Sequence, residues 1–160
     1  MTGRAALRAA LVALAAAGAA FALGPPRLTW ENAGLRVDHP PQQGAAAALA
    51  AAAVIGASWP ARRGAARAAG LAVGLGLAAF AAHRLAWRVE AKDAYLRERT
   101  LAGWKALAWG EVEAVEPSAL AVTLRGRGGR ALEVSTRGFT AEDRTRLVRT
   151  IARRVREAGR

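Results

Sequence analysis

The two histidines have the widest choice of chemistry, because a histidine can serve as a metal ligand, a general base or a proton carrier. His39 stands between Asp38 and Pro40, with one carboxylate beside it and no second histidine nearby. Zinc takes three or four protein ligands, so we interpret His39 as a linker residue. His83 precedes Arg84 at the end of an apolar stretch. Ionisable groups inside a membrane often relay protons, but a place at the end of a span favours an interfacial histidine.

Three carboxylates in the second half are the remaining candidates for acid–base chemistry: Glu111, Glu113 and Glu116. Residues two apart on a strand share one face, so we expect Glu111 and Glu113 to face solvent together. The sequence has no cysteine, which excludes thiolate nucleophiles, thiolate metal sites and disulfides. It has neither a Ser/His/Asp set nor a glycine-rich phosphate loop. We therefore expect a non-enzymatic protein with no catalytic residue, no metal site and no cofactor.

Positive charge is the strongest chemical signal in the sequence. Lysine and arginine number 24 against 12 acidic residues, a formal net charge of +12. Such a chain is attracted to polyanions, either nucleic acid or anionic lipid headgroups. Residues 140–160 are rich in arginine but hold no aromatic residue on which a base would stack. We therefore expect no specific nucleic acid, and we expect membrane lipids or a protein partner to meet the arginines of this helix: Arg146, Arg149, Arg153 and Arg156.

The first half of the chain consists of alanine-rich apolar blocks. Residues 9–26 carry no charge and follow Arg4 and Arg8, which predicts a transmembrane helix in region 1–26. A cleaved signal peptide is the alternative, because Ala20-Phe21-Ala22 offers a small-x-small cleavage pattern.

Two further blocks, 44–59 and 68–87, predict a transmembrane helical hairpin over 44–87. The first block has sixteen residues, about 24 Å of helix against a hydrocarbon core of about 30 Å, so it is the weakest span. Indole rings favour the membrane interface and arginine snorkels towards it. This assigns three residues near the ends of the spans to the interface: Trp59, Arg84 and Trp87.

A Gly-xxx-Gly motif lies inside the third span, at Gly70 and Gly74. Small residues at this spacing let two helices approach closely. The contact would lie either within the hairpin or between chains, so a homo-oligomer stays open.

A hairpin returns the chain to the side it left, so the linker 27–43 and the region 88–160 face the same compartment. Residues 28–37 read either as a strand of the C-terminal domain or as an irregular linker. In the C-terminal domain, alternating apolar residues predict a hairpin over 120–134, with a glycine-rich turn at 126–129. Earlier strands are expected at 95–101 and 111–116, and Thr140 is expected to cap an amphipathic terminal helix.

The order of elements in this half, with Trp109-Gly110-Glu111-Val112, Val115 and Phe139, resembles a bacterial PH-like (pleckstrin-homology-like) domain of a membrane protein. The resemblance covers about residues 88–159, which is short for a complete seven-stranded barrel unless the domain also uses residues 28–37. It implies a curved antiparallel sheet or partial barrel capped by one amphipathic helix, and a binding or scaffolding role. No headgroup motif of that family matches, so it does not imply phosphoinositide binding.

The predicted fold class is therefore membrane α-helical plus α+β, with three transmembrane helices and a PH-like domain. The positive-inside rule favours a multi-pass protein of the inner membrane with a cytoplasmic C-terminal domain. The first helix often dominates, and it favours the opposite orientation. The count sets five basic residues (Arg4, Arg8, Arg62, Arg63, Arg67) against seven on the domain's side (Arg27, Arg36, Arg84, Arg88, Lys92, Arg97, Arg99).

Two functions follow as hypotheses. In the first, the PH-like domain binds a protein partner or the anionic membrane surface. In the second, the protein is a small subunit of a membrane transport or envelope-assembly complex, docked through the hairpin by Gly70, Gly74 and Gly76.

Overall fold

The computed structural model describes residues 2–31, 34–59 and 64–160, without the side chains of Thr2, Arg4 and Glu31. Arg62 and Arg63, which entered the charge count, lie outside the described residues. The chain divides into two compact units. The helical unit comprises the chain up to Gly24 together with Pro40–Leu85, and the α+β unit comprises Pro25–His39 and Ala86–Arg160.

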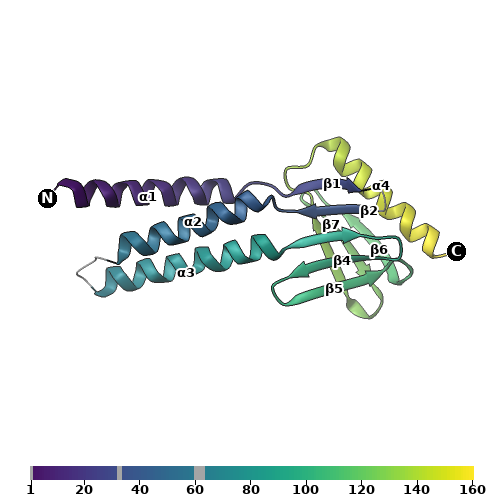
Figure 1. Cartoon of the computed structure of the whole chain (residues 1–160). Coiled ribbons are helices and arrows are strands. Elements are labelled where there is room, and N and C mark those ends of the chain that lie inside the picture. Colours follow the sequence, from purple (N-terminus) through teal and green to yellow (C-terminus); the bar gives the residue numbers. More distant parts are fainter. Residues whose placement is uncertain (1, 32–33, 60–63) are drawn as a thin grey trace. The chain divides into compact units, whose positions relative to one another are not determined.

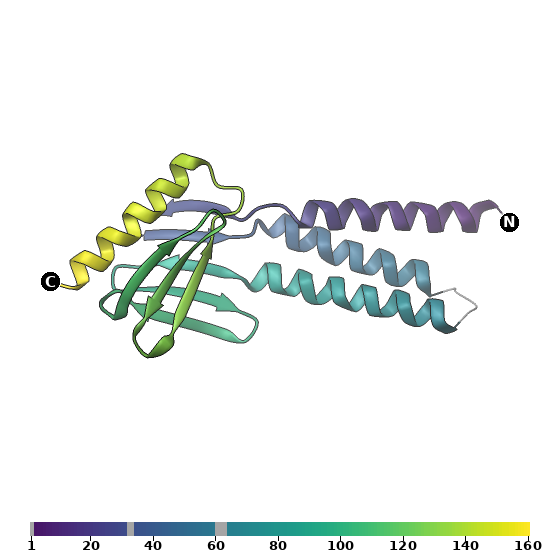
Figure 2. The same ribbon diagram turned by 180° about the vertical axis from the view of Figure 1, so that it is seen from behind.

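The helical unit contains α1 (Thr2–Ala22), α2 (Pro41–Ser58) and α3 (Gly64–Ala86). The three helices lie side by side in both views (Figure 1, Figure 2). A proline at the first position of a helix loses no hydrogen bond, so α2 begins at Pro41, three residues before the predicted span. α1 and α3 are long and apolar enough to cross a membrane. α2 is not among the helices that qualify, because its first turn is the polar Pro41-Gln42-Gln43.

Small residues fill the interior of the helical unit, and large apolar residues lie on its outside. The buried side chains are mostly alanines: Ala15, Ala22, Ala47, Ala50, Ala51, Ala53 and Ala81. The exposed ones include Leu7, Val12, Leu14, Phe21, Leu49, Val73 and Leu75. A protein that folds in water does the reverse.

Arg84 joins the ends of all three helices. Its Nη1 donates to the carbonyl oxygen of Gly24 (2.9 Å) and to Oε1 of Gln43 (3.3 Å). Its guanidinium also lies 5.0 Å from the ring centroid of Phe80. The arginine expected to snorkel is therefore hydrogen-bonded at the point where α1 ends, α2 begins and α3 ends.

The α+β unit is built from two antiparallel sheets and a terminal helix (Figure 2). The five-stranded sheet has the order β1-β2-β3-β4-β5, and the three-stranded sheet has the order β6-β7-β8. The strands are β1 (Arg27–Glu31), β2 (Gly34–Asp38), β3 (Arg88–Ala91), β4 (Tyr95–Thr100), β5 (Gly103–Ala108), β6 (Val112–Pro117), β7 (Ala121–Gly126) and β8 (Ala131–Ser135). The described part of the segment 28–37 thus joins the sheet as two paired antiparallel strands.

The predicted elements of the C-terminal half are present. β7 and β8 form the expected hairpin, and Gly128 and Gly129 in its turn have φ of 72° and 75°, which non-glycine residues rarely adopt. α4 (Ala141–Ala158) begins after Thr140, whose hydroxyl accepts a hydrogen bond from the Asp143 amide (3.1 Å). The core between the sheets and α4 contains large side chains, among them Leu96, Trp109, Leu124, Leu147 and Ile151.

Candidate functional site: the outer face of the five-stranded sheet

The outer face of the five-stranded sheet is the most basic surface that the strand register assembles. Side chains alternate along each strand. Leu28, Leu35, Val89, Leu96 and Leu107 point into the core. The alternate positions align in two rows across the sheet, Arg27–Asp38–Arg88–Arg99–Trp104 and Thr29–Arg36–Glu90–Arg97–Ala106.

Basic residues outnumber carboxylates threefold on this face. Among the side chains that the structure describes, six are basic (Arg27, Arg36, Arg88, Lys92, Arg97 and Arg99) and two are acidic (Asp38 and Glu90). These six are the residues, apart from Arg84, that the charge count placed on the domain's side. The face therefore has an excess of positive charge that its own carboxylates do not neutralise.

Aromatic rings lie among these arginines. The Arg97 guanidinium is 4.2 Å from the ring centroid of Trp104 and 5.7 Å from that of Tyr95, and the Arg99 guanidinium is 5.8 Å from Trp104. Trp104 keeps 46% of its surface exposed, although it is one of the largest apolar side chains of the unit. Exposed indole beside arginine is typical of surfaces that meet a membrane–water interface.

Glu90 holds the centre of the face together. Its Oε2 accepts hydrogen bonds from Nε (2.8 Å) and Nη2 (2.6 Å) of Arg97, and its Oε1 lies 3.5 Å from Nη1 of Arg88. Burial by itself raises the pKa of the Glu90 carboxyl, but the hydrogen bond and charge of Arg97, with the charges of Lys92 and Arg88, outweigh it. The pKa is held below its ordinary value of 4.5. Glu90 is therefore an ionised anchor that orders the arginines beside it.

The three predicted interface residues have different surroundings. Trp59 is 61% exposed, and the Arg67 guanidinium lies 4.3 Å from its ring centroid. Arg84 makes the helix-end contacts described above. Trp87 is buried in the core of the α+β unit, its indole N–H donates to Oε1 of Glu98 (3.0 Å), and its ring lies 5.1 Å from His39. An indole enclosed in this way is used for packing.

Gly70 and Gly74 lie within the helical unit. A Cβ on Gly70 would overlap Ser58, and a Cβ on Gly74 would overlap Ile55. No heavy atom lies within 4 Å of the Cβ position of Gly76 among the described residues. The Gly-xxx-Gly motif therefore lets α3 approach α2 within one chain.

The four arginines named on the terminal helix divide into two pairs. Arg146 lies over Trp30, 4.2 Å from its ring centroid, and Nε of Arg153 lies 3.7 Å from Glu157. Arg149 and Arg156 are exposed, and the structure gives them no ion-pair partner among the described residues.

The carboxylates considered for acid–base chemistry pair with arginines. Glu111 lies 2.7 Å from Arg130, Glu116 lies 2.7 Å from Arg125, and Glu113 lies 4.0 Å from Arg127. The hydrogen bond from Arg130, followed by that from the Ala108 amide, lowers the pKa of Glu111, which suits a permanently charged group. In the described part of the chain no three histidine or acidic side chains gather as a metal site would require.

The outer face was missed from the sequence because its residues are spread over five strands. The available signal was the repeated spacing of two between charged residues, as in Arg36-x-Asp38, Arg88-x-Glu90 and Arg97-x-Arg99. Only the register of the strands shows that these pairs are neighbours.

No protein-family model matches the sequence, and neither a curated protein nor a solved structure matches it.

Proposed function

We propose that this is a non-enzymatic integral membrane protein whose α+β domain binds the anionic membrane surface through the outer face of the five-stranded sheet. The observation that carries the proposal is the excess of arginine beside exposed Trp104 and half-buried Tyr95 on that face. Each basic residue near an anionic leaflet contributes about 1 kcal/mol of attraction. Six of them are enough to hold a tethered domain against headgroups.

The inverted distribution of side-chain size supports a membrane location for the helical unit. In water the exposed leucines would lose the free energy of burial, about 1.5–3 kcal/mol each. In lipid the exposed leucines lose no free energy of burial, and helix association depends instead on small residues that pack closely. Gly18, Gly70 and Gly74, each placed where a Cβ would overlap the neighbouring helix, fit that second environment.

The strand order supports three spans. β2 directly precedes α2, β3 directly follows α3, and β2 and β3 are neighbours in one sheet. Two paired strands lie on the same side of a membrane. If α3 crosses, α2 must cross back, although its own composition is the weaker. This argument favours a multi-pass protein with the N-terminus opposite the α+β domain.

Chain length keeps the proposed face close to the bilayer. Arg27 follows the end of α1 by five residues, and Arg88 follows the end of α3 by two. Five residues reach at most about 18 Å when fully extended. The first row of the outer face starts at Arg27 and contains Arg88, Arg99 and Trp104. It therefore lies at those ends of the strands that connect to the helices.

We infer a PH-like domain from the two antiparallel sheets and the single terminal helix, and a cytoplasmic position at the inner membrane from the excess of basic residues on its side. The alternative of a subunit docked through the hairpin has less support. Of the three glycines that would dock another helix, Gly70 and Gly74 already lie against α2, so Gly76 alone is available for docking.

The lipid proposal is tested with the full chain in nanodiscs. Because the sequence has no cysteine, Ala106→Cys on the outer face and Ala158→Cys at the exposed end of α4 each give a single site for an environment-sensitive fluorophore. We expect the label at 106 to shift to shorter wavelength when phosphatidylglycerol replaces half of the phosphatidylcholine, and to return in high salt because salt screens the attraction. The label at 158 should not move.

Charge reversal supplies the matched control. Arg27→Glu with Arg99→Glu should abolish the shift at 106, whereas Arg156→Glu with Arg160→Glu, at the end of α4, changes the net charge equally and should leave it. Equal losses from the two pairs, or no dependence on phosphatidylglycerol, would rule out this face as the lipid contact.

The orientation is tested with a protease and a C-terminal tag in sealed, right-side-out bacterial cells. Protection until the cells are permeabilised is the expected result. Immediate cleavage would place the domain outside and favour an envelope role.

A further inference from the structure

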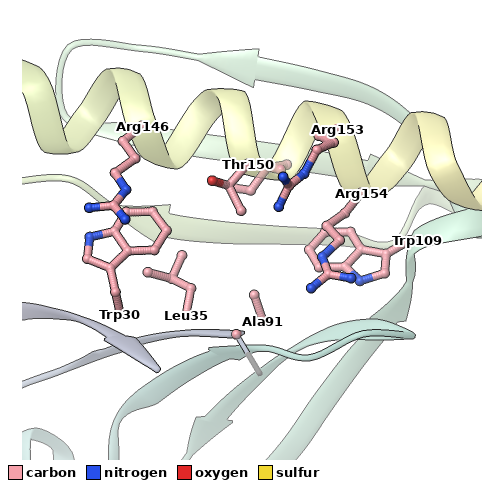
Figure 3. A pocket seen from close by; sticks show the side chains of 10 residues that line it. Trp30, Leu35, Ala91, Trp109, Arg146, Thr150, Arg153 and Arg154 are labelled. Atoms are coloured by element: carbon pink, nitrogen blue, oxygen red, sulfur yellow. The ribbon is translucent and has the colours of Figure 1, made fainter. Parts of the chain in front are cut away.

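A second basic site lies beneath the terminal helix, away from the outer face. A pocket of about 270 Å³ opens between α4 and the ends of β1, β2 and β3. Figure 3 shows Arg146, Thr150, Arg153 and Arg154 reaching down from α4, with Leu35 and Ala91 below them. Trp30 and Trp109 stand at its two ends.

The roof of the pocket is cationic. Arg146 lies over Trp30 and has no ion-pair partner among the described residues. Arg153 and Arg154 have carboxylate partners outside the pocket lining, Glu157 at 3.7 Å and Asp93 at 2.9 Å. Asp93 is 74% exposed and Glu157 is 57% exposed, so both pairs are open to water and are weak. A more strongly charged anion would compete with both carboxylates.

The floor of the pocket is apolar. Leu35 and Ala91 come from the core face of the sheet, and Ile151 comes from the buried side of α4. These three side chains and the Trp109 ring are almost wholly buried, so the apolar surface open to a ligand is the half-buried ring of Trp30, which suits a flat apolar group. The arginines of α4 therefore favour a negatively charged group in the pocket, and Trp30 favours a ring.

We propose that this pocket binds a small aromatic phosphate monoester. Its phosphate would accept hydrogen bonds from the guanidinium groups of Arg146 and Arg153 and from the Thr150 hydroxyl, and its ring would lie against Trp30. A phosphate monoester carries nearly two negative charges at neutral pH and three acceptor oxygens, and the guanidinium fork matches that geometry. The volume is below that of pockets for larger ligands, so one ring and one phosphate fill it.

The position of the pocket favours a soluble ligand over a lipid. Trp30, Gly34 and Leu35 belong to the turn end of the β1–β2 hairpin. The opposite ends of these strands, at Arg27 and Asp38, are those that continue into helices. The site is therefore independent of the proposed lipid contact, and either proposal can fail alone.

The first test is calorimetric titration of the full chain in dodecyl maltoside micelles with phenyl phosphate. We expect saturable binding at one site. Inorganic phosphate should bind at least about tenfold more weakly because it lacks the ring, and benzyl alcohol should not bind. Equal affinity for phenyl phosphate and inorganic phosphate, or no saturation, would overturn the proposal.

Two double variants of α4 separate the pocket from general charge. Arg146→Gln with Arg153→Gln should weaken phenyl phosphate binding at least about tenfold, because two charged hydrogen bonds are lost. Arg149→Gln with Arg156→Gln removes the same charge from outside the pocket and should change the affinity less than about twofold. Equal weakening by the two pairs would assign the binding to the net charge of the helix.

A measurement on the unaltered chain guards against misfolded variants. In a ¹⁵N-labelled sample, phenyl phosphate should shift the indole N–H signals of Trp30 and Trp109 and leave that of Trp104 in place. A shift confined to Trp104 would refute the pocket. Unchanged phenyl phosphate affinity in nanodiscs that contain phosphatidylglycerol supports a soluble ligand, and loss of binding there would instead assign the pocket to a lipid headgroup.

Discussion

The two units of this chain differ in where they place large apolar side chains, which are inside one unit and on the outside of the other. The α+β unit buries leucine, valine and tryptophan and exposes arginine, whereas the helical unit buries alanine and glycine and exposes leucine, valine and phenylalanine. Burial of a large apolar side chain stabilises a fold only when the alternative is water. The comparison shows that one chain of 160 residues contains two opposite packing arrangements.

The largest expected effect comes from truncating one leucine in each unit. Leu147→Ala removes a fully buried side chain of α4 and should lower the free energy of unfolding of the α+β unit by about 2–4 kcal/mol. Leu75→Ala, at a position that is 66% exposed, should cost less than about 0.5 kcal/mol. Urea unfolding in dodecyl maltoside, followed by tryptophan fluorescence and by circular dichroism, measures both. Equal costs would mean that both units bury leucine for the same reason.

Enlarging a glycine should have the next largest effect, now in the helical unit. Gly74→Leu would overlap Ile55 and should destabilise the packing of α3 on α2 by about 1–3 kcal/mol. Gly76→Leu makes the same change at a position where no heavy atom of the described residues lies within 4 Å of the Cβ, so it should be neutral. Thermal unfolding in detergent compares the two variants. A large effect at Gly76 with none at Gly74 would point to a contact between chains.

The outer face should respond to pH through Glu90. Its pKa is lower in the folded than in the unfolded chain, so its contribution is complete above the ordinary value of 4.5 and is lost as the pH falls through the lowered pKa. At pH 7, Glu90→Gln should cost about 1–2 kcal/mol, and the difference from the unaltered chain should vanish in acid. Glu113→Gln, whose carboxylate is 62% exposed and 4.0 Å from Arg127, should cost much less. A difference for Glu90→Gln that persists unchanged however far the pH is lowered would exclude its charge as the cause.

The smallest effect concerns the start of α4. Thr140→Ala removes the oxygen that accepts the Asp143 amide hydrogen and should cost about 1 kcal/mol. Thr145→Ala removes a hydroxyl that donates to the Ala141 carbonyl inside the helix. Alanine is the better helix former there, so this variant should not be destabilising. Urea unfolding at pH 7 distinguishes the opposite signs.

Elements with a local signal could be predicted from the sequence, and elements without one could not. α4 has a capping residue and an apolar stripe, and the β7–β8 hairpin has alternation and glycines in its turn. β5 was missed because Leu107 alone of its six residues is buried, which leaves no alternation to detect. β3 was missed because four residues that include Arg88 and Glu90 show little apolar pattern.

Residues at the boundary between the units were the hardest to place. Trp87 ends an apolar block and was therefore assigned to the membrane interface, yet the α+β core encloses it. A residue that follows an apolar block in the sequence can be buried in either unit, and the sequence does not show which one. The pocket beneath α4 depends on Trp30, Ala91 and Arg146, which only the strand pairing and the helix packing bring together.

The pairing of β2 with β3 also constrains the order in which the protein is made. Residues 39–87 separate Asp38 from Arg88, which are paired across the two strands. During synthesis β1 and β2 emerge before the hairpin, and they wait as an open two-stranded ribbon until α3 is complete. If the hairpin crosses a membrane as proposed, this pairing requires the start of α2 and the end of α3 to lie on the same side of it. A chain whose hairpin is placed otherwise would leave the edge of β2 unpaired.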